Sequence, residues 1–119
     1  MIAKEQNPVN LSPREMRAVG QFLSRLQAVF GSQVRQAFLF GSKARGEATS
    51  SSDIDILLLV ENETWAMKDE ICNIAADINL ENDLQIDTRV IGLERWQHME
   101  QIQAGLYRMI SQDAIPLAG

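Results

Sequence analysis

Two aspartates, Asp53 and Asp55, open an apolar stretch that continues to Val60. Residues two apart on a β-strand point to the same face of the sheet, with Cα atoms roughly 6.5 Å apart. Two carboxylates at that separation repel each other, and an apolar strand adds a desolvation cost. A divalent cation removes both penalties, and magnesium suits the position because it takes oxygen ligands and retains waters and substrate phosphates. The pair therefore predicts a magnesium site that serves phosphate chemistry.

Asp87 supplies a third carboxylate from a later stretch of alternating residues. Gln85, Asp87 and Arg89 share one face of that stretch, and the other face is mostly apolar. We expect the apolar face in the core and the polar face beside a cleft, where Asp87 can join Asp53 and Asp55. Three carboxylates can hold two metal ions about 3.5–4 Å apart, which stabilises the attacking and leaving oxygens in phosphoryl transfer. The three aspartates are the predicted catalytic and metal-binding residues, with Mg²⁺ as the ion and Mn²⁺ as its substitute; Arg89 is left outside the site.

A Gly-Ser pair precedes the aspartates and is the predicted phosphate-binding turn. Gly41 follows an apolar segment, where it permits a sharp turn and a close approach of backbone N–H groups to an anion. If a helix begins after Ser42, its first N–H groups face the same anion. The Ser42 hydroxyl adds a donor, and Lys43 or Arg45 can neutralise triphosphate charge. Gly41, Ser42, Lys43 and Arg45 are therefore the predicted nucleotide-binding residues.

These residues carry a resemblance to a known superfamily. Gly41-Ser42, followed after ten residues by Asp53-x-Asp55, resembles the signature of DNA polymerase β-type nucleotidyltransferases. The fuller string over residues 40–46 resembles the minimal nucleotidyltransferase branch, the MNT proteins. The resemblance implies a polymerase β-like fold and the transfer of a nucleotide from ATP.

The MNT resemblance also implies a partner and an acceptor. MNT proteins are typically encoded beside a HEPN-domain protein, as the antitoxin of a toxin–antitoxin pair. The resemblance therefore implies AMPylation of a tyrosine on a HEPN ribonuclease toxin, within a hetero-oligomer. It places the third carboxylate on a later strand, at Asp87. The family often has Arg where Lys43 stands, so Arg45 is the stronger expected phosphate contact.

The elements that must position these residues follow an α-β-β-α-β-α order. Ser12, Pro13 and Glu15 have the types and spacing of a capped helix start. The expected elements are a helix from there to Gly31, a strand over 34–40, a helical turn over 43–46, a loop over 48–52, a strand over 53–60, a helix capped by Thr64, a strand over 84–91 and mostly helix from 92 to 112. This predicts an α/β (α+β) fold in which helices pack on a small mixed sheet of three or more strands.

Helical periodicity gives the expected buried faces. The apolar residues expected to pack are Met16, Val19, Leu23, Leu26 and Phe30 in the first helix, Ile71, Ile74, Ala75 and Ile78 in the second, and Leu93, Trp96, Met99, Ile102, Leu106, Met109 and Ile110 near the end. Cys72 is expected to be a buried small residue and Trp65 a packing residue. His98 is expected at the surface.

The chain has 119 residues, a net charge of −5 and one cysteine. This length predicts one domain, residues 1–119. An acidic chain is repelled by nucleic-acid backbone unless its basic residues cluster, so no direct nucleic-acid binding is expected. No apolar run is long enough to cross a bilayer, and the first ten residues lack the apolar stretch of a signal peptide. We therefore expect a soluble, cytoplasmic protein without membrane contact.

Other functions are less well supported by the residues. A hydrolase with Ser42 as nucleophile lacks the Gly-x-Ser-x-Gly elbow, and no Gly-rich loop ends in Gly-Lys-Ser/Thr as in P-loop NTPases. Few residues follow the third predicted strand, which favours a protein acceptor that brings its own surface. Two alternatives stay open: an antitoxin that binds its toxin without catalysis, and a nucleotidyltransferase with a small-molecule acceptor.

Overall fold

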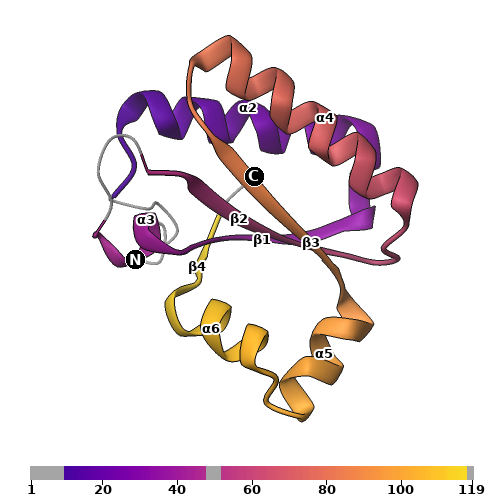
Figure 1. Cartoon of the computed structure of the whole chain (residues 1–119). Helices are drawn as coiled ribbons and strands as arrows, with labels where there is room; N and C mark the ends of the chain where they lie inside the picture. Colours follow the sequence, from indigo (N-terminus) through magenta and orange to yellow (C-terminus); the bar gives the residue numbers. More distant parts are fainter. Residues whose placement is uncertain (1–9, 48–51, 118–119) are drawn as a thin grey trace.

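A four-stranded mixed sheet organises residues 10–47 and 52–117, the part of the chain that this computed structural model describes (Figure 1). The elements are α2 (Pro13–Phe30), η1 (Gly31–Gln33), β1 (Val34–Phe40), α3 (Ser42–Arg45), β2 (Ile54–Val60), α4 (Trp65–Asn82), β3 (Ile86–Gly92), α5 (Leu93–Gln101), α6 (Gly105–Asp113) and β4 (Ile115–Pro116). The strand order is β3-β2-β1-β4, with β3 parallel to β2 and the other pairs antiparallel. The expected class, a small mixed sheet with helices packed on it, is confirmed.

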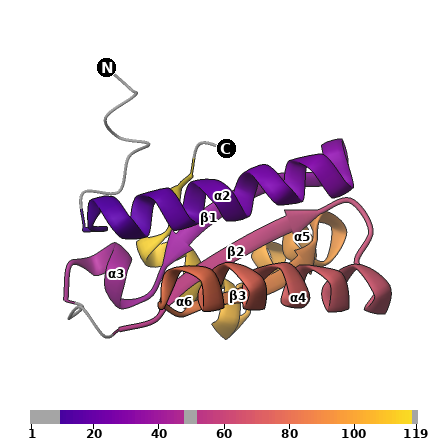
Figure 2. The ribbon, with the colours of Figure 1, turned by 90° about the horizontal axis from the view of Figure 1, so that it is seen from above.

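The helices form two layers around this sheet. Helices α2 and α4 lie side by side on one face, and α5 and α6 lie on the other (Figures 1 and 2). Alternate residues of β2 divide between the layers: Ile56 and Leu58 pack in the cluster with α2 and α4, and Leu57 and Leu59 in the cluster with α5 and α6. Strand β2 is therefore covered on both faces, as its nearly continuous apolar sequence predicts.

Helix α2 begins and ends where its sequence predicts. The Ser12 side chain accepts a hydrogen bond from the Glu15 N–H at 3.1 Å, and the Glu15 carboxylate accepts one from the Ser12 N–H at 2.9 Å. This reciprocal pair is a complete capping box. The expectation for Met16 is wrong, because its side chain is 40% exposed. Ala18 and Phe22 are fully buried instead, so the buried face of α2 is centred away from Met16.

Helix α4 is capped at Thr64, whose side chain accepts a hydrogen bond from the Met67 N–H at 3.1 Å. The buried face includes three of the four expected residues, and Ile74 is partly buried. The expectations for Cys72 and Trp65 are wrong: Cys72 is exposed, and Trp65 is 83% exposed. Positions one or two residues away from a buried helical position point about 100° or 200° away around the axis, which places both side chains off the buried face.

The last part of the chain departs from a single helical stretch. Helices α5 and α6 are separate, and Gln103 between them has a positive φ of 54°. Strand β4 was not predicted; it pairs with β1 at Phe38 and Leu39. Two residues are too few to show a period, so only tertiary pairing reveals this strand.

Packing of α5 and α6 follows the predicted apolar residues in part. Met99 and Ile110 are buried, and Trp96 packs on Tyr107 with ring centroids 4.8 Å apart. Ile102 and Met109 are 60% and 55% exposed, so their expected burial is wrong. The helices are short and each contacts the sheet along one side, which leaves their outer apolar residues in solvent.

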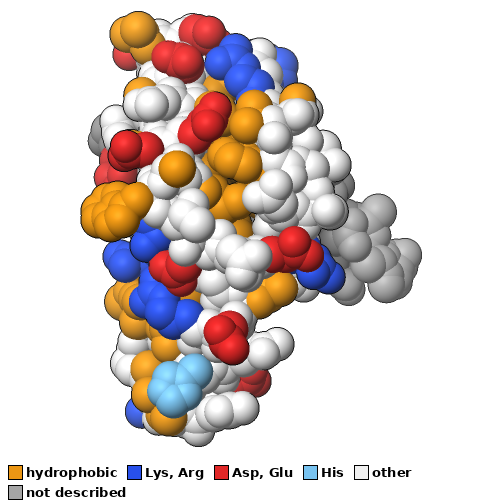
Figure 3. All heavy atoms as spheres, turned by 90° about the vertical axis from the view of Figure 1, so that its right-hand side faces the viewer, with side chains coloured by type: hydrophobic (Ala, Val, Ile, Leu, Met, Phe, Trp, Pro, Cys, Tyr) orange, Lys and Arg blue, Asp and Glu red, His pale blue; other side chains and the backbone are white. Residues whose placement is uncertain are grey.

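The surface mixes charges of both signs. On the face in Figure 3, acidic, basic and apolar side chains alternate without a broad patch of one charge. His98 is exposed, as expected. None of the helices in the described ranges has the length and apolar character needed to cross a bilayer. The expected loop over 48–52 lies outside the described residues except for Ser52.

Candidate functional site

The aspartates gather at one end of the sheet, where β2 and β3 begin. Asp55 and Asp87 are direct partners in the parallel register of these strands, and Asp55 also lies opposite Phe40 of β1. Asp55 is partly buried, and Asp53 and Asp87 are exposed. By strand alternation Asp55 shares its face with Leu57, which packs toward α5 and α6. The predicted site thus lies on the sheet face that carries these two helices.

The charges around Asp55 act on its ionisation. Partial burial raises the pKa of the Asp55 carboxyl above its usual range, and the negative charges of Asp87 and Asp53 raise it further. The positive charges of Arg45 and Arg89 offset part of this rise in pKa. The structure therefore brings all three predicted aspartates into one electrostatic neighbourhood. It adds Arg89, which sequence reasoning left out although it shares a face of β3 with Asp87.

The donor set at this end of the sheet fits a hard cation in its chemistry. It consists of carboxylate oxygens, the ligands that magnesium prefers. Within residues 10–47 and 52–117, no three acidic, histidine or cysteine side chains lie close enough together to hold a metal ion as they stand. Like charges keep such carboxylates apart until a cation joins them. Asp53, Asp55 and Asp87 remain the predicted metal ligands.

Gly41 forms the turn that the sequence predicts between β1 and α3. Its φ of 78° and ψ of −157° lie in a region that is essentially restricted to glycine. A Cβ atom at this position would overlap the Asp55 carboxylate oxygen and lie 3.1 Å from its Cγ. The Gly41 carbonyl accepts hydrogen bonds from the Ala44 and Arg45 N–H groups, both at 3.1 Å. Glycine is therefore required here by backbone conformation and by the approach of Asp55.

Lys43 has a different environment from the one expected for a phosphate ligand. Its ammonium nitrogen lies 2.7 Å from Glu15 Oε2, and both side chains are buried. Burial alone opposes ionisation of Glu15, but hydrogen bonds from Lys43 and Ser12 hold the pKa of this carboxyl below its usual range. Sequence patterns do not reveal this pair, because its members are 28 positions apart. A phosphate-binding role for Lys43 stays a prediction.

Arg45 reaches from α3 to the end of α6. Its Nε lies 2.9 Å from Glu47 Oε1, and its Nη1 lies 3.4 Å from Asp113 Oδ2. The Arg45 side chain is 41% exposed, so these ion pairs are open to solvent and can exchange for a phosphate group. Asp113 was not among the predicted site residues. It is the second acidic contact of Arg45 after Glu47.

Two cavities lie on opposite faces of the sheet. One of about 260 Å³ lies on the same sheet face as Asp55, and its lining includes Phe38, Leu57, Trp96 and Tyr107. The other, of about 290 Å³, is more polar and is lined by residues that include Glu15, Ser52, Ile54 and Gln85. Both have the concave, mixed character of a small-molecule site, and the second lies beside the segment that leads into Asp53.

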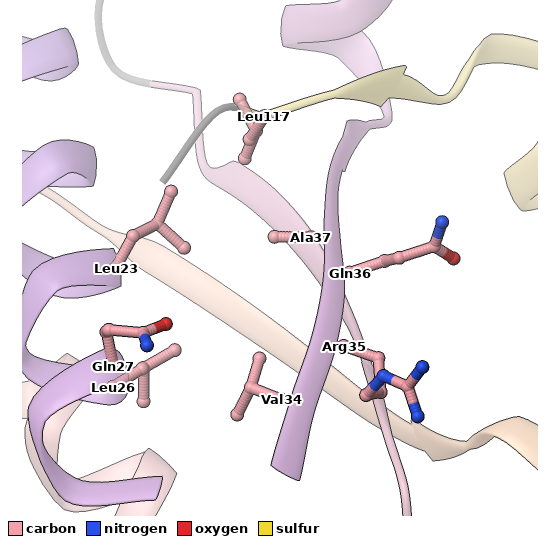
Figure 4. Close-up of a pocket in the computed structure, with 8 residues that line it drawn as sticks. All are labelled: Leu23, Leu26, Gln27, Val34, Arg35, Gln36, Ala37 and Leu117. Atoms are coloured by element: carbon pink, nitrogen blue, oxygen red, sulfur yellow. The ribbon is translucent and has the colours of Figure 1, made fainter. Parts of the chain in front are cut away.

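A third cavity lies between α2 and β1 (Figure 4). Leu23, Leu26, Val34, Ala37 and Leu117 point into it, whereas the polar side chains on β1 point the other way. Its volume is about 130 Å³. Among the residues that the structure describes, no acid, histidine or cysteine lines it.

Solved structures share this fold. A toxin–antitoxin crystallised with AMP-PNP matches with a TM-score of 0.57 and 18% identity, over 82% of this chain and 71% of that one. A proposed nucleotidyltransferase from Sulfolobus solfataricus gives 0.52 and 17%, over 96% and 83%. A proposed minimal nucleotidyltransferase gives 0.55 and 22%, over 85% and 89%. At these identities the likeness concerns the fold alone.

Two proteins of Methanocaldococcus jannaschii, both named as proposed protein adenylyltransferases, match part of the sequence. The first is 40% identical over 45 residues, which make up 38% of this chain and 45% of the relative. The second is 33% identical over 69 residues, 57% of this chain and 70% of the relative. The chain thus spans less than half the length of the first relative.

A family model also matches the sequence. The model described as "Polymerase beta, Nucleotidyltransferase" matches residues 25–112, a range that contains the Gly41–Ser42 turn and all three aspartates. This match covers most of the chain and confirms the predicted superfamily. The chain belongs to the polymerase beta nucleotidyltransferase family.

Proposed function

We propose that this chain is a protein adenylyltransferase that moves AMP from ATP to a tyrosine of a HEPN-type toxin and thereby acts as its antitoxin. The observation that carries the proposal is the register that sets Asp55 beside Asp87, with Gly41 directly against the Asp55 carboxylate. Family membership supports nucleotidyl transfer. The names of the two M. jannaschii relatives support a protein acceptor, and the toxin–antitoxin neighbour with AMP-PNP supports a toxin partner and an adenine nucleotide.

In the proposed reaction, a tyrosine oxygen attacks the α-phosphorus of ATP, and the bond to the β-phosphate breaks. Pyrophosphate leaves, and the phenolic proton passes to Asp87 or to solvent. Asp53, Asp55 and Asp87 would hold Mg²⁺, which supplies charge neutralisation to the triphosphate and acidifies the phenol, whose ordinary pKa is about 10. Gly41 and Ser42 bind phosphate oxygens through backbone and hydroxyl donors, and Arg45 offsets their charge.

Modification explains neutralisation of a ribonuclease in physical terms. An attached AMP adds a negative phosphodiester and a bulky base to the toxin. If the modified tyrosine lies where RNA binds, the added charge repels the RNA backbone and the added volume blocks it. The acceptor surface is then supplied by the partner, in a hetero-oligomer.

The decisive experiment is intact-mass spectrometry of the partner after incubation with this protein, ATP and magnesium. We expect the partner to gain one or more AMP units, and we expect no gain with Asp53→Asn or Ser42→Ala. Asp77→Asn is the matched control, because Asp77 is an exposed aspartate on α4, outside the site, and this variant should transfer normally. Inhibition of the partner without any mass change would contradict catalysis and favour an antitoxin that acts by binding. Pyrophosphate release that requires a small molecule instead of the partner would favour a small-molecule acceptor.

Nucleotide binding tests the metal assignment separately. Calorimetry should show ATP binding that depends on Mg²⁺ or Mn²⁺. The double variant Asp53→Asn, Asp55→Asn removes the charge and nearly preserves the shape. Unchanged ATP affinity in this variant would show that the two carboxylates do not hold the cation.

A further inference from the structure

We propose that the buried pair Glu15–Lys43 is a positioning device that holds the Gly41–Ser42 turn in place against the strand that carries Asp53 and Asp55. This inference rests on the proposed function for its nucleotide, but its structural part can be tested without one. It assigns a role to Glu15, a residue of α2 outside the predicted site. It also gives Lys43 an indirect role in place of direct contact with phosphate.

Glu15 connects the start of α2 to α3 through its two carboxylate oxygens. One carboxylate oxygen accepts a hydrogen bond from the Ser12 N–H at 2.9 Å and so belongs to the cap of α2. The other accepts a hydrogen bond from Lys43 Nζ at 2.7 Å. The cap fixes the Glu15 side chain to the start of an 18-residue helix, and Lys43 is the second residue of α3, next to Ser42. Through Glu15, the turn is attached to one of the two 18-residue helices on that face of the sheet.

The same carboxylate also borders the segment that leads into β2. Glu15, Ser52 and Ile54 line the polar cavity of about 290 Å³, and Asp53 stands between the last two in sequence. Glu15 therefore contacts α3 through Lys43 and lines the cavity beside the segment that carries Asp53. A shift of Glu15 or Lys43 would change the position of the turn relative to Asp53 and Asp55.

Energetics favour positioning over stabilisation as the use of this pair. The two side chains are 4% and 11% exposed, so both charges have lost most of their hydration. A buried ion pair usually adds little stability compared with apolar residues of similar size, because desolvation offsets the attraction. An unpaired buried charge is strongly disfavoured, so each side chain of the pair restricts the position of the other. The backbone hydrogen bonds of the turn, from Ala44 and Arg45 to Gly41, are local, and the Glu15–Lys43 pair adds a buried contact to α2.

A double-mutant cycle with Glu15→Gln and Lys43→Met distinguishes positioning from direct phosphate contact. Each variant is first shown to be folded by thermal unfolding, and the dissociation constant for Mg-ATP is then measured well below the unfolding temperature. We expect each single variant to raise this constant about tenfold, and the double variant to raise it by about the same factor, because both changes break the Glu15–Lys43 pair. The double variant also leaves no unpaired buried charge, so it keeps the test valid if a single variant folds poorly.

A second readout does not need nucleotide. Hydrogen exchange of the Ala44 and Arg45 amides should accelerate in both single variants, because these amides are protected by the turn that the pair holds. Lys43→Arg, which keeps the charge, should retain more protection and ATP affinity than Lys43→Met. Arg25→Gln is the matched control. It breaks the exposed 2.9 Å pair between Arg25 of α2 and Glu81 of α4, and it should change neither readout.

The outcomes separate the possibilities. Loss of ATP affinity in Lys43→Met with full affinity in Glu15→Gln would overturn the inference in favour of direct phosphate contact. Unchanged affinity and unchanged amide exchange in all folded variants would reduce the pair to a structural contact. If the wild-type protein binds no Mg-ATP, the proposed function fails, and the exchange measurement still decides whether the pair holds the turn.

Discussion

Replacement of Gly41 by alanine tests the tightest contact of the candidate site. The added methyl group would overlap the Asp55 carboxylate oxygen and approach Cγ to 3.1 Å. It would also occupy a backbone conformation, with φ of 78° and ψ of −157°, that side chains disfavour. Either the Asp55 side chain must turn away or β1 and β2 must separate locally.

Both effects have known sizes. A non-glycine residue in this backbone region costs about 1–3 kcal/mol. Overpacking of a well-packed site by one methyl group costs about 1–3 kcal/mol more. We therefore expect Gly41→Ala to lower the free energy of unfolding by about 2–6 kcal/mol, against the 5–15 kcal/mol typical of a whole domain. In an Asp55→Ala background the steric part disappears, so the cost of Gly41→Ala should fall to about 1–3 kcal/mol.

Equilibrium urea denaturation of the metal-free protein measures these free energies. Gly20→Ala is the matched control, because Gly20 is inside α2 with no atom near its missing Cβ. This control should raise stability by roughly 0.5–1 kcal/mol through helix propensity. The reasoning is refuted if Gly41→Ala unfolds with the wild-type free energy, or if its cost is the same with and without the Asp55 carboxylate.

Three further predictions concern single carboxylates. Asp55→Asn should stabilise the metal-free protein. The raised pKa of Asp55 makes the wild type lose stability as pH rises above the ordinary pKa of 3.8. Urea denaturation across pH 3–8 should therefore show that the free energy of unfolding gained by the variant grows with pH. Although burial opposes its ionisation, hydrogen bonds from Arg95 and Lys68 lower the pKa of Glu63 to about 2, so its contribution is complete above about 4.5 and is lost as pH falls toward 2. Glu63→Gln should therefore flatten acid unfolding in that window, and an unchanged acid profile would refute the assignment. Asp87→Asn should keep most ATP affinity but slow AMP transfer about a thousandfold, since one transition-state interaction of about 4 kcal/mol is lost; normal transfer rates would make Asp87 a surface acid.

Local chemistry in the sequence was enough to predict most elements. The Ser12 cap and the Thr64 cap start their helices as expected, and the first strand occupies the predicted residues 34–40. The division of β3 into an apolar and a polar face also holds, which is why Asp87 could be placed beside Asp55 before its register was known. Each of these features depends on residues within one or two turns or strand positions of each other.

The features that sequence reasoning missed depend on distant partners. The position of Lys43 after Gly-Ser predicts a phosphate ligand. Only the packing of α2 shows that its ammonium group pairs with Glu15. Arg45 contacts Asp113 across 68 positions, and β4 exists only through its pairing with β1. Periodicity identifies an apolar face but not its limits. It therefore predicts that Trp65 packs in the core, although no core covers this side chain.

The balance of charge at the candidate site bears on how a nucleotide and its cations would bind there. Three carboxylates, those of Asp53, Asp55 and Asp87, stand against the guanidinium groups of Arg45 and Arg89, and Arg45 is already shared with Glu47 and Asp113. A triphosphate would bring more negative charge to a place where Asp55 already resists ionisation. Attraction by Arg45 alone in an exposed position is weak and screened by salt. We therefore expect nucleotide binding at this end of the sheet to require cations that arrive with the triphosphate or before it.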